Sequence, residues 1–269
     1  GAGQSPSVCA DEADPRRWYT TNLVGVPAPL LASVVFQAHP QALHIAGARE
    51  ANAGLFALLE RCGPLDEARD VFAHYMSIAF GLDRPGSASH LKLLQGWGMD
   101  ANGPAGAVLK GWVESRFGLV PGFHQAPLGR FPSPAWVGYI EQKATSRYHR
   151  NSIFQQLDLL FEFCQWVLAR FQPLGRGPWV RLWRGSTRCE EQIVQGSLRS
   201  RHATVRLNNL VSFSLSRDQA ECFGDWIFEA QVPQSKLLLF PGLLSTRSLA
   251  AEAEVLALGG DYEVRASYA

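Results

Sequence analysis

The stretch Ala251-Glu252-Ala253-Glu254-Val255-Leu256-Ala257-Leu258 predicts a β-strand that carries two carboxylates two residues apart. Because strand side chains alternate between faces, Glu252 and Glu254 point to the same side. Leu256 and Leu258 continue that face, so the carboxylates border an apolar surface, as polar groups do at the rim of a small-molecule site. Two like charges on one face repel each other, and the pair therefore needs a partner elsewhere in the chain.

Short β-type runs fill the rest of the chain after residue 175, and several of them alternate apolar with polar residues. The predicted strands are Trp179–Trp183, Val205–Phe213, Trp226–Val232, Lys236–Phe240, Glu254–Leu258 and Tyr262–Tyr268. Gly259 and Gly260 are expected to turn the chain between the last two of these strands.

The first 175 residues have mainly helical periodicity. Helices are predicted to end at Gly63 and Gly81, and another is predicted around residues 107–117. The clearest helix begins near Asn151, a good N-cap, and ends before Pro173. Its apolar stripe, expected to be core, consists of Ile153, Leu157, Leu160, Phe161, Cys164, Leu168 and Phe171.

Helices followed by strands predict an α+β fold, with a mainly helical N-terminal half packed against a C-terminal β-rich core. We expect a helical region over residues 1–175 and a β-rich catalytic core over residues 176–269. Together they are expected to form one compact unit, because 269 residues suffice for a single large core.

Composition indicates a globular protein, with 46% apolar and 18% charged residues. The formal charge of +1 gives no electrostatic reason to expect nucleic acid or an anionic membrane as partner. The longest apolar run, Leu23–Phe36, is too short for a membrane span, and residues 1–6 lack the pattern of a secretory signal. Five cysteines without a C-x-x-C motif suggest reduced thiols and a cytoplasmic location.

Several common types of site lack support in the sequence. None of the seven histidines stands at metal-ligand spacing from another histidine, a cysteine or an aspartate, so no metal is expected. No G-x-G-x-x-G turn follows a predicted strand, and no P-loop motif is present. A Ser-His-Asp triad is recognised by geometry and stays open, although the chain has no G-x-S-x-G elbow.

Arg184 is one candidate partner for the carboxylates. It shares strand parity with Val180 and Leu182, so a cation ends an otherwise apolar face. Burying an unpaired cation is costly, and Arg184 therefore fits either a structural ion pair or a clamp on a diphosphate or carboxylate. Gly185 beside it would let a ligand approach the backbone closely.

Two serines are further candidates, since Ser212 and Ser214 lie on one face of a predicted strand, opposite Phe213. Serines at a strand end commonly cap the helix that follows, and Ser216 ahead of Ala220 fits such a cap. Ser212 is therefore a candidate site residue mainly because it lies in the sequence between the arginine and the glutamates.

The segments Leu182-Trp183-Arg184-Gly185, Val211-Ser212-Phe213-Ser214 and Glu252-Ala253-Glu254 resemble, in that order, the R-S-E motifs of arginine-directed mono-ADP-ribosyltransferases. Ser212 follows Arg184 by 28 residues and Glu254 follows Ser212 by 42, which is compatible with that fold. As a whole the chain resembles the dinitrogenase reductase ADP-ribosyltransferase family of nitrogen-fixing bacteria. This resemblance implies transfer of ADP-ribose from NAD, as co-substrate, to an arginine of the nitrogenase iron protein. It also implies a PII-type signal protein as regulatory partner.

The resemblance also implies a role for each motif residue. Arg184 would hold the phosphate or ribose side of NAD, and the Gly185 backbone would face the nicotinamide amide. Ser212 would orient Glu254, which would bind the 2′-hydroxyl of the nicotinamide ribose. Glu252 would receive the target arginine.

The chain departs from the wider superfamily at two places. Phe213 stands where a threonine is common. Between Pro241 and Glu252, in the loop that usually helps to recognise the target, there is no aromatic residue, and Phe240 is the nearest. Target recognition is therefore expected to rest on the helical half or on three residues of the loop: Leu243, Leu244 and Arg247.

A carboxylate pair suits this chemistry. NAD carries a cationic leaving group, so cleavage of its glycosidic bond needs stabilisation of the oxocarbenium-like sugar, and one carboxylate supplies that. A guanidinium is protonated at neutral pH, so a second carboxylate is needed to accept its proton. The alternatives are an NAD-binding regulatory protein without turnover, an NAD glycohydrolase, and a transferase to another protein's arginine.

Overall fold

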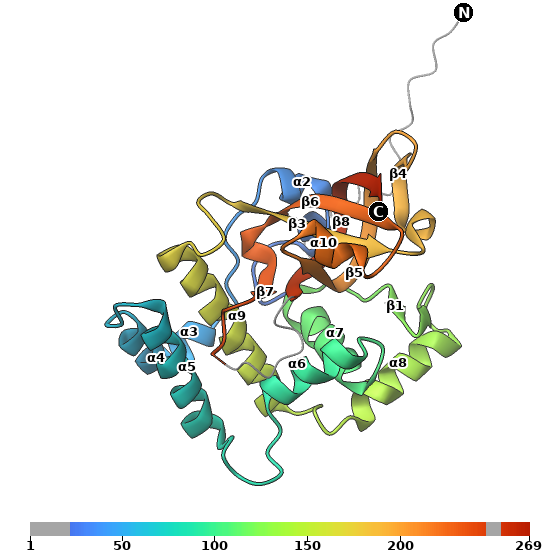
Figure 1. Cartoon of the computed structure of the whole chain (residues 1–269). Helices are drawn as coiled ribbons and strands as arrows, with labels where there is room; N and C mark the ends of the chain where they lie inside the picture. The colour runs from blue at the N-terminus through green and yellow to red at the C-terminus, as the bar shows by residue number, and fades with distance from the viewer. Residues whose placement is uncertain (1–21, 246–253) are drawn as a thin grey trace, which may run out of the picture.

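The computed structural model, which describes residues 22–245 and 254–269, has helices through most of its first two thirds and an antiparallel sheet in the last third (Figure 1). The helices are α1 (Ala28–Leu31), α2 (Val34–Ala38), α3 (Ala48–Ala51), α4 (Ala53–Leu59), α5 (Leu65–Phe80), α6 (His90–Met99), α7 (Pro104–Phe117), α8 (Pro134–Thr145), α9 (Asn151–Phe171) and α10 (Arg217–Glu221). The strands are β1 (Phe123–His124), β2 (Ala126–Pro127), β3 (Trp179–Ser186), β4 (Ile193–Ser197), β5 (His202–Ser214), β6 (Trp226–Pro233), β7 (Leu237–Leu239) and β8 (Glu254–Tyr268). The described residues also form two 3-10 turns, η2 (Cys189–Gln192) and η3 (Gln234–Lys236). The predicted α+β class is confirmed.

Most of the predicted helices form, with shifted ends. The predicted stripe of α9 is buried except at Phe171, which is half-buried. Asn151 is the first helical residue of α9, because Arg150 occupies the cap position. Gly81 ends α5 in the left-handed conformation, as expected, with φ 61°. The predicted end at Gly63 is wrong: α4 stops at Leu59, and the Gly63 N–H donates to the side chain of Glu67 instead.

The six-stranded sheet has the order β4-β5-β3-β6-β8-β7, with an additional pairing between β5 and β8 (Figure 1). This extra pairing joins β5, β3, β6 and β8 into a closed ring, to which β4 and β7 attach as outer strands. The sequence did not predict β4, because this strand is largely exposed and its burial does not alternate. Because β5 and β8 are long, their two halves pair with different strands: β5 pairs with β4 and β3, and β8 pairs with β7 and β6.

One strand replaces the last two predicted strands, and the expected turn at Gly259 and Gly260 is wrong. β8 runs without interruption through both glycines. The register shifts here, so that Asn208 and Asn209 of β5 lie opposite Gly259 in a β-bulge. A Cβ atom added at Gly259 would lie 1.4 Å from the backbone oxygen of Asn208, so the glycine allows the two backbones to approach rather than the chain to turn.

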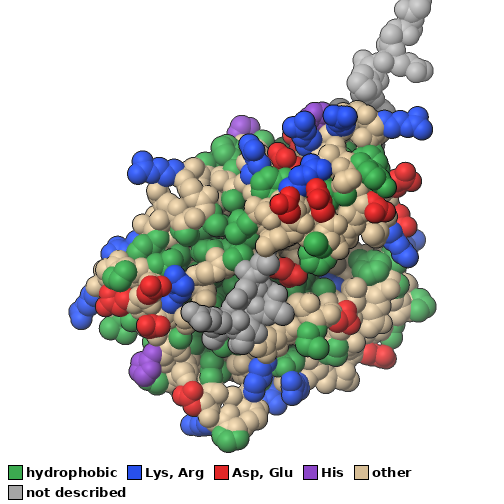
Figure 2. All heavy atoms as spheres, viewed as in Figure 1, with side chains coloured by type: hydrophobic (Ala, Val, Ile, Leu, Met, Phe, Trp, Pro, Cys, Tyr) green, Lys and Arg blue, Asp and Glu red, His purple; other side chains and the backbone are tan. Residues whose placement is uncertain are grey.

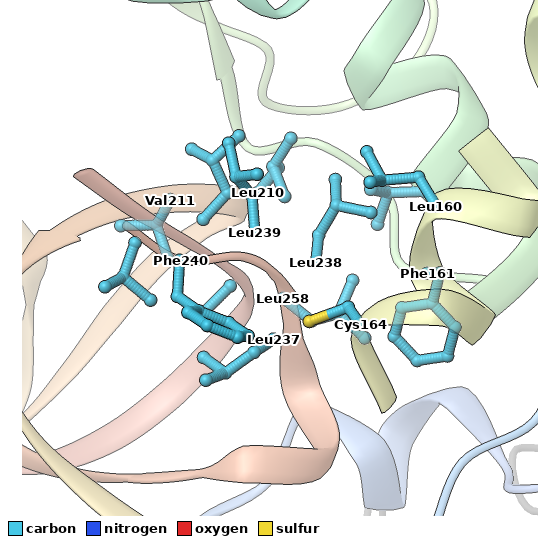
Figure 3. Packing of buried hydrophobic residues seen from close by; sticks show 14 of the residues in the cluster. Leu160, Phe161, Cys164, Leu210, Val211, Leu237, Leu238, Leu239, Phe240 and Leu258 are labelled. Carbon is cyan, nitrogen blue, oxygen red and sulfur yellow. The ribbon is translucent and has the colours of Figure 1, made fainter. Parts of the chain in front are cut away.

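The helical half and the sheet share one main hydrophobic core. Figure 3 shows side chains of α9, including Leu160 and Cys164, beside those of β7 and its flanking residue Phe240. β8 is buried on both faces from Val255 to Leu258, because helices cover one side and the ring encloses the other. The strand that begins at Glu254 is therefore fixed by packing on both of its faces.

Charges on the face shown in Figure 2 are mixed, with basic and acidic side chains interspersed. Among the described residues, no helix has both the length and the apolar character that crossing a membrane requires. The same residues hold no group of three or more histidine, cysteine, aspartate or glutamate side chains arranged to bind a metal ion.

Lys236 is an unusual feature of the core, because its side chain is fully buried. Its Nζ donates to the carbonyl of Gly259 over 3.1 Å and lies 4.8 Å from the ring centroid of Tyr262. Burial lowers the pKa of Lys236 to about 7, against the opposing attraction of Asp261. The fold therefore destabilises the charged form of the Lys236 side chain relative to its neutral form.

We expect Lys236 to make the stability of the protein depend on pH. In the unfolded chain this lysine keeps its proton up to a pKa near 10.5, whereas the folded protein releases it near pH 7. The unfolded state then binds more protons between these values, so the free energy of unfolding should rise as the pH increases from about 7 to about 10. Urea unfolding across this range should show a smaller rise for Lys236→Met. Lys110, whose pKa is lowered to about 8, is present in both proteins, so its contribution to the pH dependence cancels in the comparison. If the free energy of unfolding rises equally with pH in wild type and Lys236→Met, the prediction is wrong.

Candidate functional site

Three of the predicted site residues come together at one end of the sheet. β3 meets β5 at the pair Trp183 and Ser214, and β5 meets β8 at the pair Ser214 and Glu254. Since Arg184 and Ser212 lie close to these pairs in their strands, the pairings bring both of them to Glu254. The convergence of residues 184, 212 and 254 thus follows from how three strands meet.

Hydrogen bonds join the three residues directly. The Arg184 Nη1 donates to the backbone oxygen of Ser212 over 2.7 Å. The hydroxyl of Ser212 donates to Oε2 of Glu254 over 3.1 Å. Ser212 therefore contacts both charged groups, with its backbone bonded to the guanidinium and its side chain to the carboxylate.

The charges of Arg184 and Glu254 interact within a partly buried environment. Burial raises the pKa of the Glu254 carboxyl, while the Ser212 hydrogen bond and the Arg184 charge oppose this shift. Burial also lowers the pKa of the Arg184 guanidinium, and the charge of Glu254 opposes that shift. Each group therefore helps the other to stay ionised at the edge of an apolar core.

Arg184 retains hydrogen-bonding capacity for a ligand. Its Nε is buried and has no hydrogen-bond partner among the residues that the structure describes. A buried donor without a partner is costly, and an anionic oxygen of a bound molecule would satisfy it. This fits the phosphate or ribose oxygens of NAD, the ligand that the sequence motifs implied.

Gly185 has a structural reason to be glycine. A Cβ atom at this position would lie 2.2 Å from the backbone oxygen of Ala220, in α10. The helix α10 therefore packs directly on the backbone of β3 at this residue. The expected contact between Gly185 and the nicotinamide amide stays a prediction.

The serines of β5 and the following turn have different positions. The Ser216 Oγ accepts from the backbone N–H of Gln219 over 3.3 Å and caps α10, which confirms the predicted cap. Ser214 is buried, whereas Ser212 is half-buried and faces Glu254. Ser212 is thus the serine whose hydroxyl takes part in the site.

The predicted recognition loop is described only in part. Glu252 and Arg247 lie outside the described residues. The prediction that Leu243 contacts the target is wrong, because its side chain is completely buried in the main core. Phe240 is buried as well, and Leu244 is half-buried. Of the apolar residues named for this role, Leu244 alone has an accessible side chain.

Trp97 belongs to the site as well, although no sequence motif indicated it. Its indole Nε1 donates to Oγ of Ser212 over 3.0 Å, so a residue of α6 contacts the group that binds Glu254. Trp97 precedes Ser212 by 115 residues and lies in α6, a helix that was not predicted from the sequence. No local pattern could have revealed this contact.

The most evident cavities lie elsewhere. One, of about 240 Å³, lies beside α5 and α6 and is lined by Met76, His90 and Leu244 among others. Another, of about 480 Å³, follows β6 and β8 near Trp179 and Glu263. Neither cavity is lined by Arg184, Ser212 or Glu254.

An arginine, a serine and a glutamate that converge from three strands of one antiparallel sheet are what an R-S-E mono-ADP-ribosyltransferase requires. The chain belongs to the dinitrogenase reductase ADP-ribosyltransferase family, whose model matches residues 21–266. It is similar to the NAD(+)–dinitrogen-reductase ADP-D-ribosyltransferase of Rhodospirillum rubrum, with 50% identity over 264 residues, covering 93% of this chain and 95% of the relative. No solved structure matches the chain.

Proposed function

We propose that this protein transfers ADP-ribose from NAD to an arginine of dinitrogenase reductase. The observation that carries the proposal is the hydrogen-bonded convergence of Arg184, Ser212 and Glu254. The similarity to the R. rubrum transferase, which extends over nearly the whole of both chains, supports the substrate assignment. No described group of residues is suited to bind a metal, and the proposed reaction requires none.

In this proposal Glu254 stabilises the sugar as the glycosidic bond breaks. The bond between the ribose C1′ and the nicotinamide nitrogen breaks with its electron pair going to nicotinamide, which leaves as a neutral molecule. Positive charge then develops on the ribose, and the Glu254 carboxylate, which is linked to Arg184 through Ser212, would compensate it. The Ser212 hydrogen bond keeps that carboxylate oriented.

The acceptor side of the reaction is assigned to Glu252 by its position in the E-x-E motif. A nitrogen of the target guanidinium bonds to C1′, and it must lose a proton as this bond forms. Glu252 would accept that proton as a general base. The two glutamates thus have separate duties, one for the donor and one for the acceptor.

The proposal can be tested by incubating the full chain with labelled NAD and purified dinitrogenase reductase. We expect label on the reductase and a mass increase of one ADP-ribose on a peptide containing arginine. If no label is transferred under any nucleotide condition, the proposal is wrong. Regulation by a PII-type signal protein stays a prediction from the family resemblance, and co-purification would test it.

The Glu252→Gln variant should separate transfer from hydrolysis. Loss of the acceptor-side base should lower arginine modification by about 10²-fold or more. Hydrolysis of NAD, in which water replaces arginine as the acceptor, should fall much less. Both activities are measured with the same labelled NAD. Glu229→Gln is the control, since Glu229 takes no part in the hydrogen bonds that join the three converging residues and forms an ion pair with the exposed Arg181. Equal losses in both activities would contradict the division of roles.

A further inference from the structure

The indole of Trp97 restricts what the Ser212 hydroxyl can do. An indole N–H can only donate, so Ser212 Oγ must be the acceptor in the 3.0 Å bond from Trp97. The serine keeps one hydrogen, and its oxygen lies 3.1 Å from Oε2 of Glu254. A carboxylate accepts, so the hydroxyl hydrogen is directed to Glu254. The three residues form a chain of hydrogen bonds with one consistent direction.

Trp97 is held rigidly enough to impose this direction. Its side chain is only 5% exposed. The neighbouring Gly96 allows α6 to approach α7 so closely that an added Cβ would lie 2.6 Å from the Cβ of Ala105. The backbone of α6 next to Trp97 is therefore fixed by a close contact with α7.

α7 is in turn fastened to the strand that carries Ser212. The buried side chain of Asn209 in β5 donates to the backbone oxygens of Lys110 and Leu119, each over 2.9 Å. The Nζ of Lys110 lies 5.9 Å from the ring centroid of Trp97. The helical half is therefore attached to β5 at two points, by Asn209 within the bulge and by Trp97 at Ser212.

We propose that Trp97 is a positioning residue for the reaction, which directs the Ser212 hydroxyl to donate to Glu254. This inference rests on the proposed function of Glu254 but adds a part of the molecule that the sequence motifs do not contain. In this proposal the helical half takes part in the site, because its residue Trp97 supplies the hydrogen-bond donor that fixes the orientation of the Ser212 hydroxyl.

A consequence follows for the titration of Glu254. The Ser212 hydrogen bond favours the ionised carboxyl and opposes the rise of its pKa that burial causes. Without the indole, the hydroxyl can rotate and donate elsewhere, so the pKa of Glu254 should move further upward. A purely structural tryptophan would leave this titration unchanged.

The test compares Trp97→Phe with wild type by two measurements. Carbon NMR of labelled glutamate side chains should show Glu254 titrating at higher pH in the variant. In the transfer assay, kcat should fall about three- to tenfold, the effect of one hydrogen bond, while KM for NAD changes less than twofold. The acidic limb of the pH profile of kcat should shift in the same direction as the NMR titration.

Two further variants make the comparison specific. Trp166→Phe is the matched control, because Trp166 is also 5% exposed and its indole donates to a carboxylate, Glu60, over 2.8 Å. It should leave the Glu254 titration unchanged. Ser212→Ala should raise the pKa of Glu254 by itself, and adding Trp97→Phe to it should cause no further shift. Independent, additive shifts would overturn the inference.

A measurement on the unmutated tryptophan covers the case in which Trp97→Phe fails to fold. In wild type, the indole N–H resonance of Trp97 should shift with the pH at which Glu254 titrates, and Glu254→Gln should abolish this shift. A resonance that does not respond to Glu254 overturns the inference. Because the NMR titrations need no turnover, they distinguish this result from failure of the proposed function, which would appear as an inactive wild type.

Discussion

Glu254→Gln should reduce ADP-ribose transfer by about 10²- to 10³-fold in kcat, the loss typical when one preorganised group that stabilises developing charge is removed. The amide keeps the shape of the carboxyl and its bond from Ser212, but it carries no negative charge to compensate the sugar cation. Because the same charge serves both reactions, transfer to arginine and hydrolysis should fall together, unlike in Glu252→Gln. Labelled NAD with dinitrogenase reductase and a nicotinamide-release assay measure the two losses.

The control for this prediction is a second carboxylate on the same sheet. Glu229 in β6 forms an ion pair with Arg181 at 3.6 Å on the surface, so Glu229→Gln should retain nearly full activity. NAD affinity, measured by calorimetry, should change little in Glu254→Gln, because Arg184, the residue that we propose binds the NAD phosphate, is unchanged. An active Glu254→Gln protein would end the assignment of this residue and favour an NAD-binding role without turnover.

Gly259→Ala should cause the largest loss of stability, at least about 3 kcal/mol. The new Cβ would overlap the backbone oxygen of Asn208, which no side-chain rotation can relieve. β5 and β8 would have to separate at the bulge, and this opening would also disturb the register that brings Ser212 to Glu254. Urea unfolding and the residual transfer activity of the folded fraction would measure both effects.

Gly138→Ala is the matched control for the backbone effect. Gly138 lies on the exposed face of α8, and an added Cβ would meet nothing within 4 Å. Alanine is the better helix former, so this variant should be more stable than wild type by about 0.5–1 kcal/mol. Similar stability of the two alanine variants would show that the bulge tolerates a side chain and that the close approach at Gly259 is not required.

The sequence predicted those features that depend on neighbours along the chain. The apolar stripe of α9, the end of α5 at Gly81 and the Ser216 cap were all predicted correctly, because each is set by residues within one or two turns. The turn at residues 259–260 was predicted wrongly for the corresponding reason. A pair of glycines indicates backbone freedom, but only the approach of Asn208 shows whether that freedom serves a turn or a bulge.

By itself the sequence determined which chemical groups the protein has and their order: a guanidinium at the end of one predicted strand, and a hydroxyl and a carboxylate on two others. Only the tertiary structure decided that these groups meet, because their distances depend on the pairing of β3, β5 and β8 and on the bulge that sets its register. It also decided that Trp97 joins them, by packing α6 against the end of β5. Periodicity records which side of an element is buried, whereas contacts between distant residues arise only when the elements pack together.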